Sequence, residues 1–170
     1  MSTADGLIKI SYPVEAGSWD GASGENIWVQ LVELVDMDPP HRTIATVESI
    51  PFSTRTLSCG DKILLKYEKR ENRVVFVSIV ERGGHSTCQI YVEKENLDAS
   101  AMLKRMKVIG CGWEGGQHGS GKIYALDIPP EVDFDETFDF LKNGQDEGHW
   151  TFQTGYIGHP EKDQSASPSS

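Results

Sequence analysis

The stretch Glu81–Val92 gathers the side chains most suited to chemistry, with His85, Ser86 and Cys88 close together. A histidine beside a serine or cysteine can act as the base that activates a nucleophile. Successive side chains of a strand point to opposite faces, so the adjacent His85 and Ser86 would not meet if this stretch is a strand. We therefore expect them to bind backbone groups at a turn rather than to form a catalytic pair.

Cys111, Glu114 and His118 are possible metal ligands, because thiolate, carboxylate and imidazole groups bind zinc. A structural zinc site normally needs four ligands, often including closely spaced cysteines, and the three cysteines of this chain lie far apart. We expect no metal and no other cofactor. The odd cysteine number also argues against a disulfide framework and favours the cytoplasm.

The glycine-rich segment Gly110–Gly121 superficially resembles a phosphate-binding loop. It lacks the Gly-Lys-Ser/Thr ending of such loops, and the sequence after it has strand-like rather than helical character. The segment is better interpreted as a mobile hairpin. It displays Trp113, a residue type that is common at the centre of protein interfaces, and Trp113 is therefore a candidate contact for another protein.

The strongest charge signal is acidic and lies between residues 127 and 147, where Lys142 is the only base. Carboxylates at the N-terminus of a helix interact favourably with its dipole, which explains Asp133, Asp135 and Glu136. Asp139, Asp146 and Glu147 fall outside that explanation. Together with Asp135 they are candidates for binding a protein partner, and a solvated helix face is the alternative.

Composition narrows the function further. The net charge is −10, and residues 83–170 account for −7 of it with 7 basic and 14 acidic side chains. Nucleic acids are bound mainly by Lys and Arg, so we expect no nucleic-acid binding, whereas a basic protein partner fits this charge. The chain has no run of 18 apolar residues and no secretory signal pattern, so we expect a cytoplasmic protein with no membrane contact. The oligomeric state stays open.

The first half predicts a small antiparallel β-barrel or meander over residues 25–82. Period-2 patterns, typical of strands, cover residues 26–34, 42–49, 62–69 and 74–80, and turn residues separate them. Short strands at this spacing are typical of small barrels. Residues 1–24 are rich in small and polar residues and predict a flexible arm with at most one edge strand, at Leu7–Tyr12.

The second half, residues 83–158, predicts a ferredoxin-like α+β unit that begins at the joint Gly83-Gly84. Strand patterns at 86–93, 111–114, 123–128 and 149–157 alternate with helical patterns at 98–109 and 133–143. Asp98 is the predicted N-cap of the first helix, Asp133 begins the second with Glu136 three residues later as in a capping box, and Gly144 is its predicted end. Strand parity directs Ile90, Leu126 and Phe152 toward the helices, and we expect the first unit to cover the opposite face of the sheet. This βαββαβ order predicts the strand order 4-1-3-2 and both helices on one face, and we expect strands one and three to be parallel. The tail, residues 159–170, is polar and is predicted to be disordered.

Several short phrases resemble a family of short bacterial proteins, about 150 residues long and catalogued as a domain of unknown function. They are Glu25–Val29, Ile50–Phe52 followed by Leu57 and Gly60-Asp61, Gly84–Thr87, Leu126–Pro129, and Leu141 through Trp150. The resemblance covers about residues 25–157. That family carries no established activity, so the resemblance implies the architecture and not a reaction.

These observations favour a non-enzymatic protein-binding module of a regulatory, inhibitor or immunity type that binds a basic protein through its acidic C-terminal half. The alternative is a small enzyme or ligand binder with a site at the junction of the two units. In that case the candidate residues are His85, Ser86, Tyr91 and His149.

Overall fold

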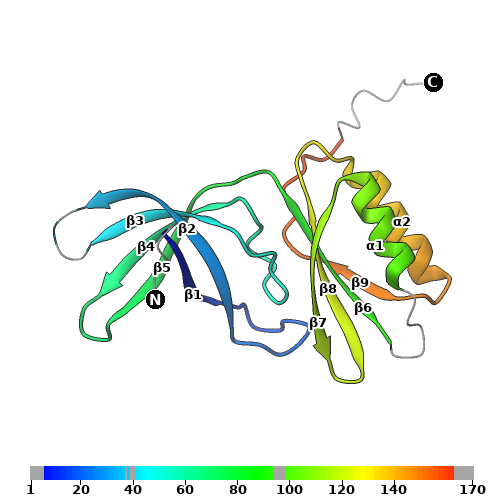
Figure 1. Ribbon diagram of the computed structural model, residues 1–170, viewed down its shortest axis with the longest axis horizontal. Helices are drawn as coiled ribbons and strands as arrows, with labels where there is room; N and C mark the ends of the chain where they lie inside the picture. The colour runs from blue at the N-terminus through cyan, green and yellow to red at the C-terminus, as the bar shows by residue number, and fades with distance from the viewer. Residues whose placement is uncertain (1–5, 37, 39–40, 94–98, 163–170) are drawn as a thin grey trace.

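The computed structural model describes residues 6–36, 38, 41–93 and 99–162. It has a mixed α+β architecture with two antiparallel sheets that follow one another along the long axis of the molecule (Figure 1). Two helices lie against the face of the second sheet that points away from the first. None of the helices in the described part of the chain is long and apolar enough to cross a membrane.

Sheet A is a curled half-barrel of five strands in sequence order. They are β1 (Leu7–Pro13), β2 (Gly24–Asp36), β3 (Arg42–Val47), β4 (Lys62–Glu68) and β5 (Arg73–Glu81). Each strand is antiparallel to the next. Curling brings β1 to β5, where the rings of Tyr12 and Phe76 lie 4.7 Å apart, and the concave side encloses a core that includes Ile27, Val29 and Leu65.

The predicted N-terminal arm contains a full strand of this sheet. β1 pairs with β2 over seven residues, from Leu7 opposite Gln30 to Pro13 opposite Gly24. Its alternating side chains Ile8, Ile10 and Tyr12 are buried in the core. The alternation at Leu7–Tyr12 therefore indicated a strand, and that strand covers the open side of the core that β2 would otherwise expose.

Sheet B has four strands: β6 (Ser86–Val92), β7 (Gly112–His118), β8 (Gly121–Ile128) and β9 (Thr151–Thr154). Their order, β7-β8-β6-β9, is the order expected from the sequence. The expected parallel pairing is wrong, because β6 and β8 run antiparallel. β7 runs in the same direction as β6, because α1 connects opposite ends of the two strands. After the two-residue turn that follows His118, β8 runs in the opposite direction.

The two helices are α1 (Ala99–Ile109) and α2 (Phe134–Asp146). The predicted N-cap of α2 is confirmed, since the Asp133 side chain accepts a 3.0 Å hydrogen bond from the amide of Glu136. The Glu136 carboxylate pairs with Arg105 at 3.5 Å. Asp98, the N-cap predicted for the first helix, lies outside the described residues. Both helices pack on side chains that strand parity had directed toward them, including Ile90, Leu126 and Phe152.

α2 does not end at Gly144, where the sequence suggested a stop. The helix runs on to Asp146, and a glycine with positive φ, Gly148 at +81°, follows its end. Gly144 is buried inside the helix because the indole of Trp150 lies on it: a Cβ at this position would be 1.9 Å from Cζ2 of Trp150. The glycine therefore serves close packing rather than helix termination.

Candidate functional site

The junction loop, residues 48–61 between β3 and β4, connects sheet A to the face of sheet B that is turned away from the helices. Gln89 Nε2 donates a hydrogen bond of 3.1 Å to the carbonyl of Pro51, and the hydroxyls of Ser58 and Thr87 lie 2.8 Å apart. Gln89 and Thr87 are buried. This face of sheet B is therefore covered by the first unit, as the size of that unit led us to expect.

Three carboxylates from the segment before and inside β2 hold the junction loop in place. Glu25 accepts hydrogen bonds from the backbone amides of residues 52–54. Asp20 accepts one from the Ser53 hydroxyl, and Glu15 accepts from the Thr54 hydroxyl and the Arg55 amide. The polar backbone of the loop is thus satisfied without a regular strand.

These contacts make the junction sensitive to acid. Burial acts to raise the pKa of Glu15 and of Asp20, but the hydrogen bonds that their carboxylates accept outweigh it, and both pKa values lie below the usual range. A pKa that is lower in the folded protein stabilises the fold above the unfolded-state pKa, and this stabilisation is lost as the pH falls through the folded-state pKa.

We expect Glu15→Gln and Asp20→Asn to lower the free energy of unfolding near neutral pH and to flatten its decline from about pH 5 downward. Urea unfolding curves of the wild type and both variants across this range measure the effect. Burial raises the pKa values of Glu114 and Asp127, so these two residues change the stability with pH in the opposite direction. The measured quantity is therefore the difference in the free energy of unfolding between each variant and the wild type at each pH. A difference that stays constant with pH would contradict the role of these carboxylates.

Asp61 fixes the joint between the units from within. Its carboxylate is completely buried and accepts hydrogen bonds from the amides of Ser58 (2.9 Å) and Gly83 (3.0 Å) and from the Arg82 guanidinium (2.9 Å). Arg82 also stacks on the ring of Tyr156, 3.7 Å from its centroid. Gly83 passes so close to Gly60 that a Cβ would lie 2.5 Å from the Gly60 carbonyl oxygen, so this position of the joint requires glycine.

His85 interacts with a carboxylate and not with the neighbouring serine. Its Nδ1 lies 2.8 Å from Oδ1 of Asp127 on β8. Burial raises the pKa of Asp127, and the hydrogen bond and charge of His85 act in the opposite direction. His85 and Ser86 do not form a pair, but strand parity is not the reason, because β6 begins at Ser86 and His85 precedes it. The expectation that both side chains bind backbone groups is met by Ser86 and is wrong for His85, whose partner is a carboxylate.

Ser86 is bound instead to His159, in the segment that follows β9. Ser86 Oγ lies 2.6 Å from Nδ1 of His159 and accepts hydrogen bonds from the amides of Gly158 and His159. Nε2 of His159 lies 2.9 Å from the carbonyl oxygens of both Pro129 and Val132, which can only accept. In the neutral imidazole Nε2 therefore carries the proton, and Nδ1 accepts the proton of the Ser86 hydroxyl. The hydroxyl is fully buried and fully bonded, so it has no access to a substrate.

We expect Ser86→Ala to lower the free energy of unfolding by about 1–3 kcal/mol, because it leaves the amides of Gly158 and His159 without their acceptor in a mostly buried site. Thermal unfolding and amide exchange of residues 156–160 measure the loss. Ser78→Ala, at an exposed position on β5, is the comparison variant. Equal stability of the two variants would show that the hydroxyl does not hold the C-terminal segment.

The remaining junction candidates are apart from these pairs. Tyr91 lines a cavity of about 130 Å³ together with Trp19, Ile123 and other side chains between the two units. His149 is exposed, and its Nε2 lies 3.1 Å from the carboxylate of Glu147. The structure therefore does not bring His85, Ser86, Tyr91 and His149 together into one site.

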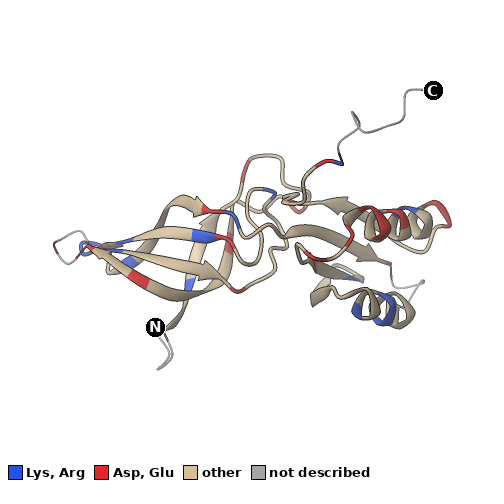
Figure 2. Cartoon of the chain, turned by 90° about the horizontal axis from the view of Figure 1, so that it is seen from above, with Lys and Arg blue, Asp and Glu red and all other residues tan. Residues whose placement is uncertain are grey.

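The acidic candidates lie on the outer side of α2 and at its end. Asp135, Asp139, Asp146 and Glu147 are all exposed. Figure 2 shows Asp and Glu concentrated on α2, whereas α1 carries Lys and Arg. Their ion pairs are within the chain: Asp135 with Lys162 at 2.9 Å and Asp146 with Lys142 at 3.2 Å.

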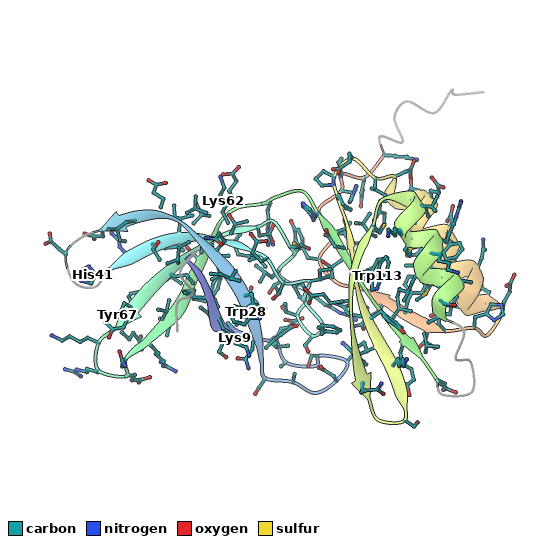
Figure 3. The ribbon with its side chains drawn as sticks, viewed as in Figure 1. Lys9, Trp28, His41, Lys62, Tyr67 and Trp113 are labelled. Atoms are coloured by element: carbon teal, nitrogen blue, oxygen red, sulfur yellow. The ribbon has the colours of Figure 1, made fainter. Side chains whose placement is uncertain are left out.

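Trp113 differs from the exposed anchor that the sequence suggested. It is on β7, opposite Leu126, and packs half-buried against the helix-side core of sheet B (Figure 3). The surrounding glycines belong to the strand rather than to a long flexible turn: a Cβ on Gly115 would lie 3.1 Å from the ring of Tyr124. Trp113 therefore contributes most of its apolar surface to the fold.

Thiol and metal chemistry find little support at these positions. Burial raises the pKa of Cys59 and Cys88 to about 12 and that of Cys111 to about 11, which keeps these thiols protonated at neutral pH. Within the described residues, no three His, Cys, Asp or Glu side chains are grouped so that they could hold a metal ion. The His118 side chain lies outside the described part.

Comparison with known proteins places this architecture in a family. Residues 33–152, 120 of the 170 residues, match a family described as a domain of unknown function, DUF4265. The chain belongs to the DUF4265 family. A crystal structure of a hypothetical protein from Neisseria gonorrhoeae resembles this DUF4265 protein with a TM-score of 0.60 and 12% identity, covering 94% of this chain and 100% of that chain. At this identity the likeness shows the fold alone. No curated protein matches the chain.

Two contacts that hold the junction of the DUF4265 protein together join residues that the sequence does not relate. The buried Asp61–Arg82 pair joins residues 21 positions apart, and Ser86–His159 joins residues 73 positions apart. Helix and strand periodicity relates only residues a few positions apart, so it cannot predict either contact. The one local signal for the second was Gly158: it approaches the chain so closely that a Cβ would lie 2.3 Å from the carbonyl oxygen of His85.

Proposed function

We propose that this DUF4265 protein is a non-enzymatic protein-binding module of a regulatory, inhibitor or immunity type, and that the outer side of α2 binds a basic protein. The observation that carries the proposal is the exposure of all four carboxylates at Asp135, Asp139, Asp146 and Glu147. A cytoplasmic location and a ferredoxin-like class for the second unit are parts of the same proposal.

The geometry of these carboxylates suits exchange of partners. Their present ion pairs are solvent-exposed, with Lys142 and Asp146 about 60% exposed and Lys162 73% exposed. Exposed ion pairs contribute little stability, about 0–1 kcal/mol. A Lys or Arg of another protein can therefore take the place of Lys142 or Lys162 beside these carboxylates with little loss of stability. The net charge of −7 in residues 83–170 would also speed the approach of a basic protein.

The geometry of the junction supports a binding role over an enzymatic one. His85 is paired with Asp127 and the Ser86 hydroxyl is buried and saturated, so neither is placed as a base or nucleophile facing open space. The cavity beside Tyr91, about 130 Å³, is smaller than the several hundred Å³ usual for ligand sites.

Affinity capture from the native host with two charge-reversal variants tests the proposal. One variant carries Asp139→Lys, Asp146→Lys and Glu147→Lys; the control carries Glu48→Lys, Glu71→Lys and Glu81→Lys, also exposed but on the first unit. Both change the net charge equally. We expect the control to keep the partner and the α2 variant to lose it, with binding that weakens as salt rises. A partner held equally well by both variants would contradict an interface on α2.

A further inference from the structure

The end of sheet A that points away from sheet B forms an apolar hollow of about 330 Å³. Figure 3 shows His41 and Tyr67 at this end, far from Trp113. Leu31 and Val74 line the hollow and pack on the barrel core, so the hollow continues the core outward. Leu34 lines it too, yet it is 55% exposed.

The strand lengths explain why the core is open here. β1 begins at Leu7, opposite Gln30, so the part of β2 beyond Gln30 extends past the first residue of β1. A register shift between Leu31 and Glu33 bends this part of β2 and leaves Val32 56% exposed. Large apolar side chains are thus presented at the mouth of a half-barrel, a common place for ligand sites.

A second hollow, about 720 Å³, adjoins the first by sharing His41 and Tyr67, and the β4–β5 hairpin lines it. Lys66 and Arg73 of this region form ion pairs with Glu68. Lys69 and Arg70, at the tip of the hairpin, are exposed and form no ion pair with the residues that the structure describes.

The charge at this end differs from that of the whole molecule. Four cationic side chains and three acidic ones line the two hollows, a net of +1 in a protein of net −10: Arg42, Lys66, Lys69 and Arg70 against Glu33, Glu68 and Glu71. Figure 2 shows Lys and Arg mixed with Asp and Glu on sheet A, whereas Asp and Glu predominate on α2. Because Arg42 is paired with Asp36 and Lys66 with Glu68, the cationic side chains placed to attract an anion are Lys69 and Arg70.

We propose that the open end of sheet A binds a small anionic amphiphile, an aliphatic chain that ends in a carboxylate. The aliphatic chain would cover Leu31, Leu34 and Val74, and the carboxylate would lie at Lys69 and Arg70, where charge-assisted hydrogen bonds can form. This site is separate from the α2 face and does not depend on the protein-binding role.

Titration with sodium decanoate, followed by NMR of the full chain, tests the proposal. We expect saturable shifts confined to residues 31–35, 41–43 and 66–74. Leu34→Glu should weaken binding about tenfold, because it places a carboxylate in the apolar hollow. Val108→Glu is the matched control, since Val108 is 77% exposed on α1, and it should leave the affinity unchanged.

The cationic part of the site is tested separately. Lys69→Ala with Arg70→Ala should weaken decanoate binding several-fold, whereas Lys104→Ala with Lys107→Ala on α1 should not. Decyltrimethylammonium, with the same chain and the opposite charge, should bind more weakly than decanoate. Absence of saturable shifts, unchanged affinity in a folded Leu34→Glu variant, or equal binding of the two amphiphiles would overturn the proposal.

Discussion

Replacing Asp61 by alanine is expected to lower the free energy of unfolding by about 2–4 kcal/mol, because it removes a buried carboxylate that accepts hydrogen bonds from two backbone amides and from the partly exposed guanidinium of Arg82. The Asp61 side chain is 0% exposed, and the substitution leaves Arg82 and the amides of Ser58 and Gly83 without their acceptor. Because these groups belong to both sides of the joint, the whole junction should loosen together. Urea denaturation, with tryptophan fluorescence as the probe, measures the change.

Asp36→Ala is the control for Asp61→Ala. Asp36 also pairs with an arginine, Arg42, at 3.1 Å, but both side chains are at least one-third exposed. Its removal should change stability by no more than about 1 kcal/mol. Asp61→Asn should fall between the two, since it keeps an acceptor and loses the charge. A loss below about 1 kcal/mol for Asp61→Ala would sink the idea that this carboxylate organises the junction.

Gly144→Ala is expected to destabilise the protein by about 1–3 kcal/mol, the usual cost of overpacking. In an exposed helix the same change would stabilise by about 1 kcal/mol, so the sign distinguishes the two effects. The new methyl group would meet the indole of Trp150, whose Nε1 donates a 2.9 Å hydrogen bond to the Leu141 carbonyl. Thermal unfolding measures the loss, and near-ultraviolet circular dichroism reports the displaced ring.

Gly112→Ala is the matched control, because a Cβ at Gly112 has no atom within 4 Å. A second check uses Trp150→Leu: in the Gly144→Ala background this change should cost less than in the wild type, because the smaller side chain relieves the clash. Additive effects of the two substitutions would contradict direct contact as the cause.

Local patterns in the sequence predict most of the elements of this fold. Alternating apolar residues indicated the strands, including β1, and the spacing of Met102 and Met106 indicated α1. The cap at Asp133 and the parity of Ile90 and Leu126 were also predictable, because each depends on residues only a few positions apart. The domain boundaries and any binding role of α2 stay predictions.

The predictions that were wrong share one physical cause, which is close packing between residues that no periodic pattern in the sequence relates. Glycines at Gly115 and Gly144 suggested a flexible turn and a helix end, yet each gives room to an aromatic ring, that of Tyr124 or of Trp150. His159 was assigned to the tail because its surroundings are polar, whereas its partners Ser86 and Val132 come from far earlier in the chain. Such contacts depend on the folded arrangement and leave no period in the sequence.

The strand order has a consequence for folding during synthesis. Every strand of sheet A pairs with its neighbour in sequence, so sheet A can form as soon as β5 leaves the ribosome. β6 instead lies between β8 and β9 and needs the chain up to Thr154, and Ser86 needs His159. We expect the N-terminal unit to fold first on the ribosome, and the junction to close only after the residues up to His159 have left the ribosome.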